Sequence, residues 1–167
     1  GSPHFRKNLK TALNVFQELS KFYSNLKFLV VSYSRDDIPR TLESYNKIEK
    51  LNKVILLKKI PREDIIGLLT LSDLLLNPTL EEGFGLPNIE AQICKTPVVS
   101  SNISCIPEIL GDSALLINPL DELMIFHACE SLIKSKNLRN DLVKKGNVNI
   151  EKYTDINKYS SLLELFN

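Results

Sequence analysis

The chain has 167 residues, of which 43% are hydrophobic and 25% are charged, a composition typical of one soluble globular domain. Its 21 Lys and Arg residues nearly balance its 20 Asp and Glu residues, so it lacks the global field that would hold nucleic acid or an anionic membrane. No apolar run in the sequence approaches the roughly 20 residues of a membrane span, and the three cysteines form no C-x-x-C pair, which predicts reduced thiols in a cytoplasmic protein.

The first half of the chain alternates predicted helices with buried strands. Apolar residues spaced by three and four predict an amphipathic helix from Asn8 to Tyr23. Continuous apolar runs predict strands at 27–32, 53–57 and 73–78. A weaker helix is expected near 41–50, and another from Pro61 to Leu71, where a proline and two acids suit a first helical turn.

The second half continues the same alternation. It predicts strands at 97–101 and 114–118, helices from about Pro87, from Asp121 to about Ser135, from Asn137 to about Lys145 and from Asp155 to Phe166, and a helical turn from Pro107 to Leu110. Strands that are apolar on both faces, separated by helices, indicate a parallel sheet covered on both sides. The fold class is therefore predicted as α/β, a doubly wound, Rossmann-like parallel sheet.

The chain opens on a loop and a helix with no strand before them. In the common 3-2-1-4-5-6 strand order the first strand lies in the middle of the sheet, so its absence predicts a gap between neighbouring strands. We expect that the chain is part of a longer protein, and that another chain could contact the open sheet edge.

The segment EEGFGLPNIEA, residues 81–91, predicts an anion site. Gly83 and Gly85 let the backbone approach a ligand, and Pro87 suits the start of a helix. A helix N-terminus with free amides is a ready phosphate site. A simple glycine turn between strand and helix explains the same spacing equally well.

Two acids in this segment favour a ligand. Like charges about 4 Å apart repel by roughly 4 kcal/mol at an effective dielectric near 20, so Glu90 is expected to bind hydroxyl groups rather than phosphate. A ribose diol is the natural partner of Glu90, and a second polyol that of Glu82. The alternative for Glu90 is an acid favoured by the helix dipole, and Glu81 is expected to face solvent.

The stretch EEGFGLPNIEAQICKTPVVSSNISCIPEILGDSALLINP resembles the donor-site signature of the family-4 (group 1) retaining glycosyltransferases of the GT-B fold. The shared features are E-x7-E, GFGLP, EA, TPVV, PE-x-x-G and an apolar strand ending in NP, and RKNL near the start resembles the phosphate-loop segment of that family. The resemblance implies that residues 1–167 are the C-terminal, nucleotide-sugar-binding half of such an enzyme, with the N-terminal acceptor domain absent from this chain.

The resemblance also implies roles for individual residues. Glu82 would contact the transferred sugar, and Lys7 would neutralise the leaving phosphates with Arg6 as a helper. Glu90 would bind the ribose. The diphosphate would lie on the backbone of the loop formed by Gly83, Phe84, Gly85 and Leu86.

As a whole, the resemblance implies retaining transfer of a hexose from a nucleoside diphosphate sugar, such as GDP-mannose or a UDP-hexose, to a glycan or lipid-linked acceptor. It implies no cofactor and no metal, and the sequence holds no D-x-D motif. It leaves open a peripheral association of the complete protein with the inner face of a membrane. The frequent use of Lys, Asn and Ile points to an AT-rich bacterial genome, and so to bacterial surface polysaccharide synthesis. Two alternatives remain: a sugar-nucleotide epimerase on the same fold, and a binding module without catalysis.

A few further residues carry weaker expectations. Lys58 and Lys59 could frame the nucleobase or could simply be solvated, and the loop at 102–104 is expected to border the donor cleft. His4 lies close to Lys7 in the sequence and is a lesser candidate for contact with the donor. His127 is expected on the surface, opposite the apolar face of its helix.

Overall fold

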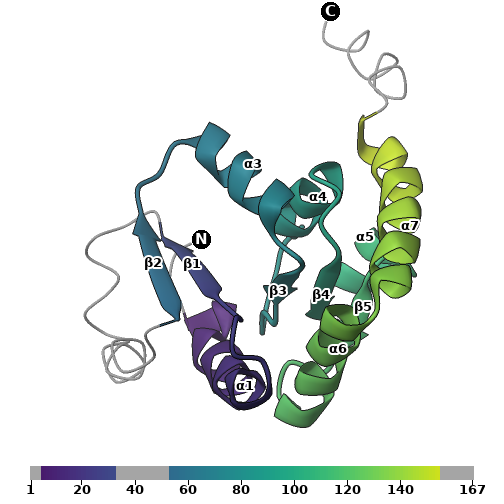
Figure 1. The fold of residues 1–167 in the computed structure, drawn as a ribbon. Helices are drawn as coiled ribbons and strands as arrows, with labels where there is room; N and C mark the ends of the chain where they lie inside the picture. The colour runs from purple at the N-terminus through teal and green to yellow at the C-terminus, as the bar shows by residue number, and fades with distance from the viewer. Residues whose placement is uncertain (1–4, 33–52, 155–167) are drawn as a thin grey trace, which may run out of the picture.

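The computed structural model describes residues 5–32 and 53–154 (Figure 1). The first half contains η1 (Phe5–Lys7), α1 (Leu9–Phe22), β1 (Phe28–Ser32), β2 (Val54–Lys58), α3 (Arg62–Leu71) and β3 (Leu75–Asn77). The second half contains α4 (Leu86–Ile93), β4 (Val98–Ser101), α5 (Ile106–Leu110), β5 (Leu115–Ile117), α6 (Glu122–Lys134) and α7 (Lys136–Thr154). The helices and strands predicted within these ranges are all present. Those expected near 41–50 and 155–166 lie outside the described residues.

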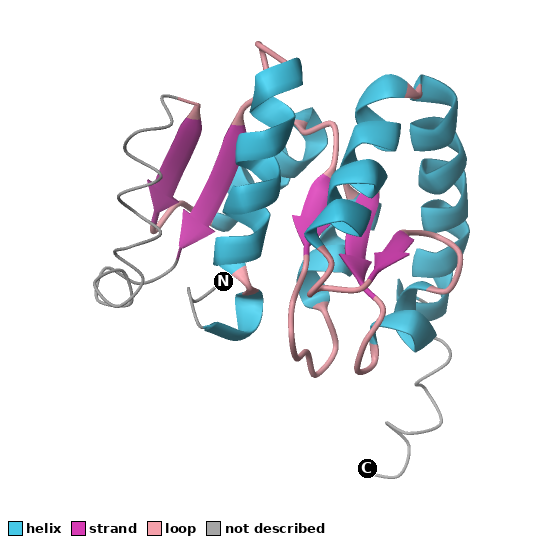
Figure 2. Cartoon of the chain, turned by 90° about the horizontal axis from the view of Figure 1, so that it is seen from below, coloured by secondary structure: helices cyan, strands magenta, loops and turns pink. Residues whose placement is uncertain are grey.

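All the strand pairs found in the described residues are parallel. β1 pairs with β2, with Phe28 opposite Val54, and β4 lies between β3 and β5. No pairing joins β1 to β3 among the described strands, so the sheet is divided at the position where the sequence predicted a gap. Figures 1 and 2 show the two parts of the sheet standing apart, with α3 reaching from the end of β2 across to α4.

Helices cover both faces of the β3–β5 part of the sheet. Successive residues of a strand point to opposite faces, and the two central valines of β4 follow this rule. Val99 packs with α1, α6 and α7, whereas Val98 packs with α4 and α5. Both valines are fully buried. The predicted doubly wound arrangement is therefore confirmed around β4.

The last helix differs from its prediction in both length and cap. The sequence predicted a helix from Asn137 to about Lys145, but α7 runs from Lys136 to Thr154, and the Ser135 hydroxyl accepts a hydrogen bond from the Leu138 amide at 3.1 Å. Gly146 does not end the helix, because it packs closely against the side chain of Gln92 in α4. Tertiary contact thus outweighs the weak helix propensity of glycine.

None of the helices in the two described ranges is both long and apolar enough to cross a membrane.

Candidate anion and sugar site

The loop between β3 and α4 requires glycine at position 85. Gly85 is the N-cap of α4 with φ of 85°, a left-handed conformation that side chains rarely adopt. A Cβ atom at this position would lie 2.7 Å from Cδ1 of Ile106 and 2.9 Å from Nδ2 of Asn88. At Gly83, by contrast, a Cβ atom would meet nothing within 4 Å. The second glycine therefore fixes the shape of the turn through its backbone conformation and close packing, whereas the sequence analysis predicted both glycines for the approach of a ligand.

The N-terminus of α4 presents backbone amides at this turn. Leu86 and Pro87 are the first two helical residues, and the described backbone hydrogen bonds include none donated by Gly85 or Leu86. The Asn88 amide already donates to the Gly85 carbonyl at 2.9 Å, and Pro87 has no N–H. The amides of Gly85 and Leu86, together with the positive end of the helix dipole, are the groups here that could bind an anion.

Lys7 and Glu82 form a direct ion pair across the site. Lys7 Nζ donates to Glu82 Oε2 at 2.5 Å, although 75 residues separate the two side chains. The side chains are 31% and 16% exposed, so water screens this pair less than it screens a surface pair. The two residues expected to act on the sugar and on the leaving phosphates are thus in contact.

Two elements position Lys7. The Arg6 carbonyl accepts hydrogen bonds from the Leu80 amide at 2.7 Å and from the Thr79 hydroxyl at 2.9 Å, which ties η1 to the loop after β3. Asn8, the N-cap of α1, donates from Nδ2 to the Pro119 carbonyl at 2.8 Å, in the loop after β5. Lys7 is therefore held between two loops at the carboxyl edge of the sheet, where ligands bind in doubly wound folds.

The Arg6 side chain points to a different acid. Its Nη1 lies 3.8 Å from Oε2 of Glu81, and both side chains are largely exposed. A pair of this kind is worth little in water. Glu81 is exposed as predicted, and its contact is with Arg6 rather than with the glycine loop.

Glu90 lies about one helical turn inside α4, and its carboxylate meets Arg62. Arg62 Nη2 donates to Glu90 Oε1 at 3.3 Å, and Arg62 is the first residue of α3. Both acids that flank the glycine loop therefore carry a cationic partner from another element. The sequence analysis identified both acids and Lys7, but not Arg62.

The Phe84 side chain packs against α7. Its ring meets the ring of Tyr153 edge to face, with the centroids 5.7 Å apart. The Tyr153 hydroxyl in turn donates to the Ile109 carbonyl at 3.1 Å. The part of α7 that the sequence did not predict thus supports the glycine loop. Leu86, next to it, is exposed.

Buried polar side chains lie beneath the loop. Thr79, Asn88, Ser100 and Ser101 are each 0% exposed. Ser101 Oγ donates to the Thr79 carbonyl at 2.6 Å, and Asn77 Nδ2 donates to Asn88 Oδ1 at 3.0 Å. The first bond joins the end of β4 to the segment after β3, and the second joins the end of β3 to α4. The sequence analysis missed these residues, although polar residues at the ends of apolar strands are a signal that could have found them.

The residues that directly follow the loop at 102–104 pack against the segment that holds Glu82 and Gly85, and the expectation that 102–104 border a donor cleft stays a prediction. Cys105 follows this loop, and its thiol lies 3.4 Å from the Glu82 carbonyl as a donor. The side chain of Ile106 contacts Gly85. The loop therefore supports the backbone on which Glu82 and the glycines lie.

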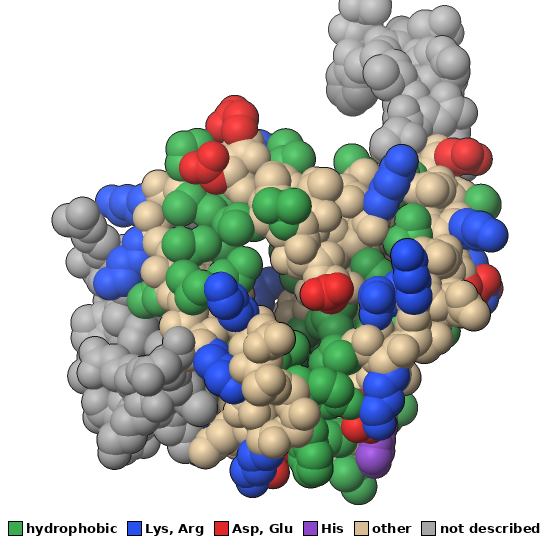
Figure 3. Space-filling view, in the orientation of Figure 1, with side chains coloured by type: hydrophobic (Ala, Val, Ile, Leu, Met, Phe, Trp, Pro, Cys, Tyr) green, Lys and Arg blue, Asp and Glu red, His purple; other side chains and the backbone are tan. Residues whose placement is uncertain are grey.

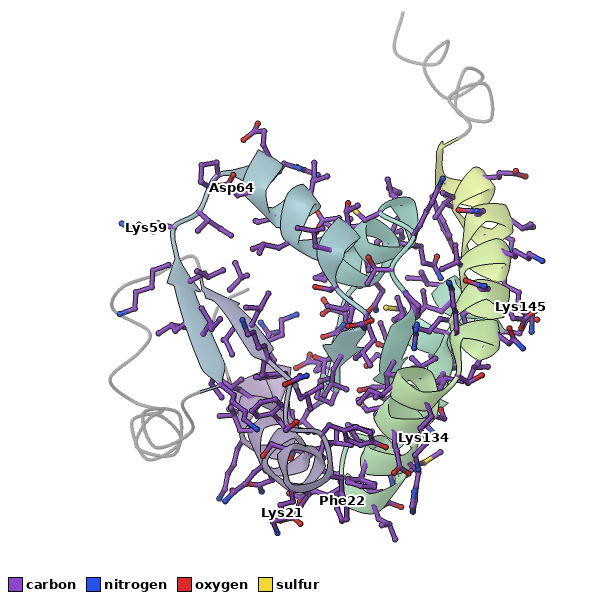
Figure 4. The ribbon with its side chains drawn as sticks, in the orientation of Figure 1. Lys21, Phe22, Lys59, Asp64, Lys134 and Lys145 are labelled. Carbon is purple, nitrogen blue, oxygen red and sulfur yellow. The ribbon has the colours of Figure 1, made fainter. Side chains whose placement is uncertain are left out.

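The remaining candidates lie away from these contacts. Figure 4 shows Lys59 projecting outward at the end of β2, and Lys58 is also exposed. His127 is 63% exposed, with Nδ1 3.8 Å from Glu130 Oε2, so its surface position is confirmed. His4 lies outside the described residues. Within the described ranges, no group of three or more His, Cys, Asp or Glu side chains is arranged to hold a metal ion.

The family follows from comparison with known proteins. The family model described as glycosyl transferases group 1 matches residues 2–148. The chain belongs to this family. The predicted family is therefore confirmed, and the matched region contains both acids, the glycine loop and Lys7.

Individual relatives agree with this assignment. Over 137 residues the chain is 32% identical to the O-antigen chain mannosyltransferase B of Escherichia coli, an alignment that covers 79% of this chain and 35% of that protein. The chain thus spans about a third of the length of this glycosyltransferase relative.

Solved structures share the fold. One is the C-terminal domain of a glycosyl transferase group 1 family protein (LpcC) from Francisella tularensis, with a TM-score of 0.80 and 22% identity over 92% of this chain and 82% of that one. Another, described as trehalose-6-phosphate from E. coli bound with UDP-2-fluoro glucose, has a TM-score of 0.75 and 18% identity over 95% of this chain and 40% of that one. The predicted fold class, an α/β fold with a parallel sheet that matches the C-terminal domains of GT-B glycosyltransferases, is therefore confirmed.

Proposed function

We propose that this chain binds a nucleoside diphosphate sugar and that the complete protein transfers the hexose, with retention of configuration, to a glycan or lipid-linked acceptor. The observation that carries the proposal is the Lys7–Glu82 pair, at 2.5 Å, between the sheet edge and the amide-rich start of α4. A cation and free amides with one acid on either side suit a ligand that has a diphosphate between two polyols.

The diphosphate lies against the amides at the start of α4 and against Lys7. An ammonium group has three donors, and Glu82 takes one of those of Lys7. The remaining donors are available to phosphate oxygens. Because the pair is largely shielded from water, the cation is already oriented before the donor binds.

The two acids bind the two polyols. Glu90, about one turn into α4, accepts hydrogen bonds from the ribose hydroxyls, and Glu82 accepts them from the transferred hexose. This assignment avoids direct carboxylate–phosphate contact, which repulsion disfavours. The UDP-sugar bound in a structure of the same fold supports a nucleoside diphosphate sugar as the ligand.

In the reaction, the glycosidic bond to the diphosphate breaks and negative charge accumulates on the leaving phosphate. Lys7 stabilises this charge more in the transition state than in the ground state. No cofactor or metal is required in this scheme, and Glu82 orients the sugar rather than attacking it. The leaving phosphate takes the proton of the acceptor hydroxyl as that hydroxyl attacks the same face, which retains the configuration.

The acceptor site lies in another part of the protein, because the aligned region covers only 35% of the mannosyltransferase relative. That relative supports a hexose donor such as GDP-mannose and a role in bacterial surface polysaccharide synthesis. The complete enzyme works in the cytoplasm, at the inner face of the membrane where a lipid-linked acceptor would be presented. The present chain alone is expected to bind the donor without turnover.

Calorimetric titration of GDP, UDP and their hexose conjugates into this chain tests donor binding. We expect at least one of them to bind, and we expect Glu90→Ala to weaken that binding by about 10- to 100-fold, the loss of hydrogen bonds to a charged group. Failure of all these ligands to bind, or binding that Glu90→Ala leaves unchanged, would refute the donor site.

Turnover is tested in the complete protein. Glu82→Ala should abolish most transfer while donor binding persists, because its contact is with the sugar. Undiminished transfer would remove Glu82 from the mechanism. Release of a changed free sugar without any acceptor would instead indicate the epimerase alternative.

A further inference from the structure

The contact between Arg62 and Glu90 depends on a fixed arrangement of two helices. Arg62 begins α3, and its Nη2 lies 3.3 Å from Oε1 of Glu90 in α4. At the other end of α3, the buried Thr96 side chain donates to the Leu69 carbonyl at 2.6 Å. Figure 4 labels Asp64 in the first turn of α3, at the end of the helix that carries Arg62. The packing of α3 therefore places the guanidinium group of Arg62 next to the carboxylate of Glu90.

Stability does not account for this contact. The Arg62 side chain is 78% exposed and that of Glu90 is 36% exposed. Exposed pairs of this kind contribute about 0–1 kcal/mol, because water screens the charges and two long side chains lose freedom. The contact matters only if something covers it, since the loss of water strengthens an ion pair.

The neighbouring anion site supplies a reason for a cation here. Glu90 follows Leu86 by four residues, which corresponds to about 6 Å along the helix axis. A diphosphate on the α4 amides would therefore repel the carboxylate of Glu90. A guanidinium group against one oxygen of this carboxylate offsets the repulsion and leaves the lone pairs of the other oxygen open.

We propose that Arg62 is a positioning residue that acts through Glu90 to set recognition of the ribose. The inference rests on the proposed donor site. Arg62 holds the Glu90 carboxylate in the orientation that accepts the ribose hydroxyls, so that less side-chain freedom is lost on binding. When the nucleoside covers the two side chains, the pair loses water and holds the carboxylate more firmly.

A positioning role of Arg62 can be distinguished from a direct contact between Arg62 and the base or the phosphates. If Arg62 acts through Glu90, removing it should harm binding of the ribose form more than binding of the 2′-deoxy form. A cation that binds the base or the phosphates would lose the same affinity for both forms. In the orientation of Figure 1, the space-filling view of Figure 3 shows a hollow between the two parts of the molecule.

The test is calorimetric titration of GDP, UDP and their 2′-deoxy forms into the full chain, into three single variants, and into Glu90→Ala with and without Arg62→Ala. Arg62→Ala should lower affinity for the bound ribonucleotide by about 3- to 10-fold and bring the ratio of ribose to deoxyribose affinity towards one. Arg62→Lys should restore part of the ratio. Lys144→Ala, which removes one exposed charge from α7, is the matched control and should change neither quantity.

Two outcomes would overturn the inference: an unchanged ratio of ribose to deoxyribose affinity in Arg62→Ala, whether both affinities fall equally or neither falls, or a loss that persists in full in a Glu90→Ala background. Failure of the proposed function is distinct, because then no diphosphate binds the unaltered chain or Glu90→Ala has no effect. A fall of the urea unfolding midpoint in Arg62→Ala that matches the loss of affinity would also contradict a positioning role.

Discussion

Replacing Gly85 with alanine tests the geometry on which the whole site depends. The new Cβ would lie 2.7 Å from Cδ1 of Ile106 and 2.9 Å from Nδ2 of Asn88. Both atoms belong to side chains, but these residues are 0% exposed, so a shift must be made within the packed core. The left-handed φ of 85° adds about 1–2 kcal/mol for any residue with a Cβ, and overpacking adds about 1–3 kcal/mol. We expect a loss of about 2–5 kcal/mol in the free energy of unfolding.

Urea and thermal unfolding of Gly85→Ala and Gly83→Ala measure this difference. In Gly83→Ala the new Cβ has no atom within 4 Å, so the free energy should change by less than about 1 kcal/mol. At roughly 3 °C per kcal/mol for a domain of this size, Gly85→Ala should lower the melting temperature by about 10 °C. Nucleotide affinity should also fall in Gly85→Ala, because the loop that holds the diphosphate changes shape. Equal stability of the two variants would refute the close contact inferred at Gly85.

Three further predictions concern the support of the site and the rest of the core. Asn149→Ala removes the bond from Nδ2 to the buried Gln92 Oε1, at 2.9 Å, and leaves that oxygen without this donor, so urea unfolding should show a loss of about 1–3 kcal/mol. Burial raises the pKa of the Cys129 thiol to about 12, so a thiol reagent at pH 8 should modify the other two cysteines first and Cys129 only after unfolding. The hydrogen bond from Lys134 lowers the pKa of Glu130 below 4.5, so its stabilisation is present above that pH and is lost as the pH falls through the lowered value. Melting temperatures of Glu130→Gln should therefore depend less steeply on pH in the acid range.

The sequence predicted most of the fold because its strands are short, apolar runs with strong boundaries. Some helix boundaries were predictable as well. Asp121 was predicted as a helix cap, and its Oδ1 accepts a hydrogen bond from the Met124 amide at 2.9 Å. The length of α7 could not be predicted in this way. The helix continues past Gly146 because Asn149, 4% exposed, bonds to α4, and no local pattern encodes that contact.

The site was predictable in part, for a similar reason. The acids and glycines lie in one short segment, where their spacing shows on inspection. Their partners come from elsewhere: Lys7 is 75 residues from Glu82, and Arg62 is 28 residues from Glu90. Lys7 was found through the family resemblance, whereas Arg62 carries no pattern of its own. Contacts of this range depend on the packing of α1 and α3 and need the structure.

The pairing of the acids resolves a conflict in the charge argument. A site that binds a diphosphate with amides should avoid carboxylates, since like charges about 4 Å apart repel by roughly 4 kcal/mol at an effective dielectric near 20. This site has an acid on either side of its amides. Lys7 balances Glu82 and Arg62 balances Glu90, so the two acids can serve as hydroxyl acceptors without adding net negative charge beside the phosphates. On the proposed function, each cation keeps its paired acid available as a hydroxyl acceptor. A variant that lacks Lys7 or Arg62 should therefore bind nucleoside diphosphates less well while the paired acid remains in place, and the loss in the Arg62 variant should be larger for the ribose form than for the deoxyribose form.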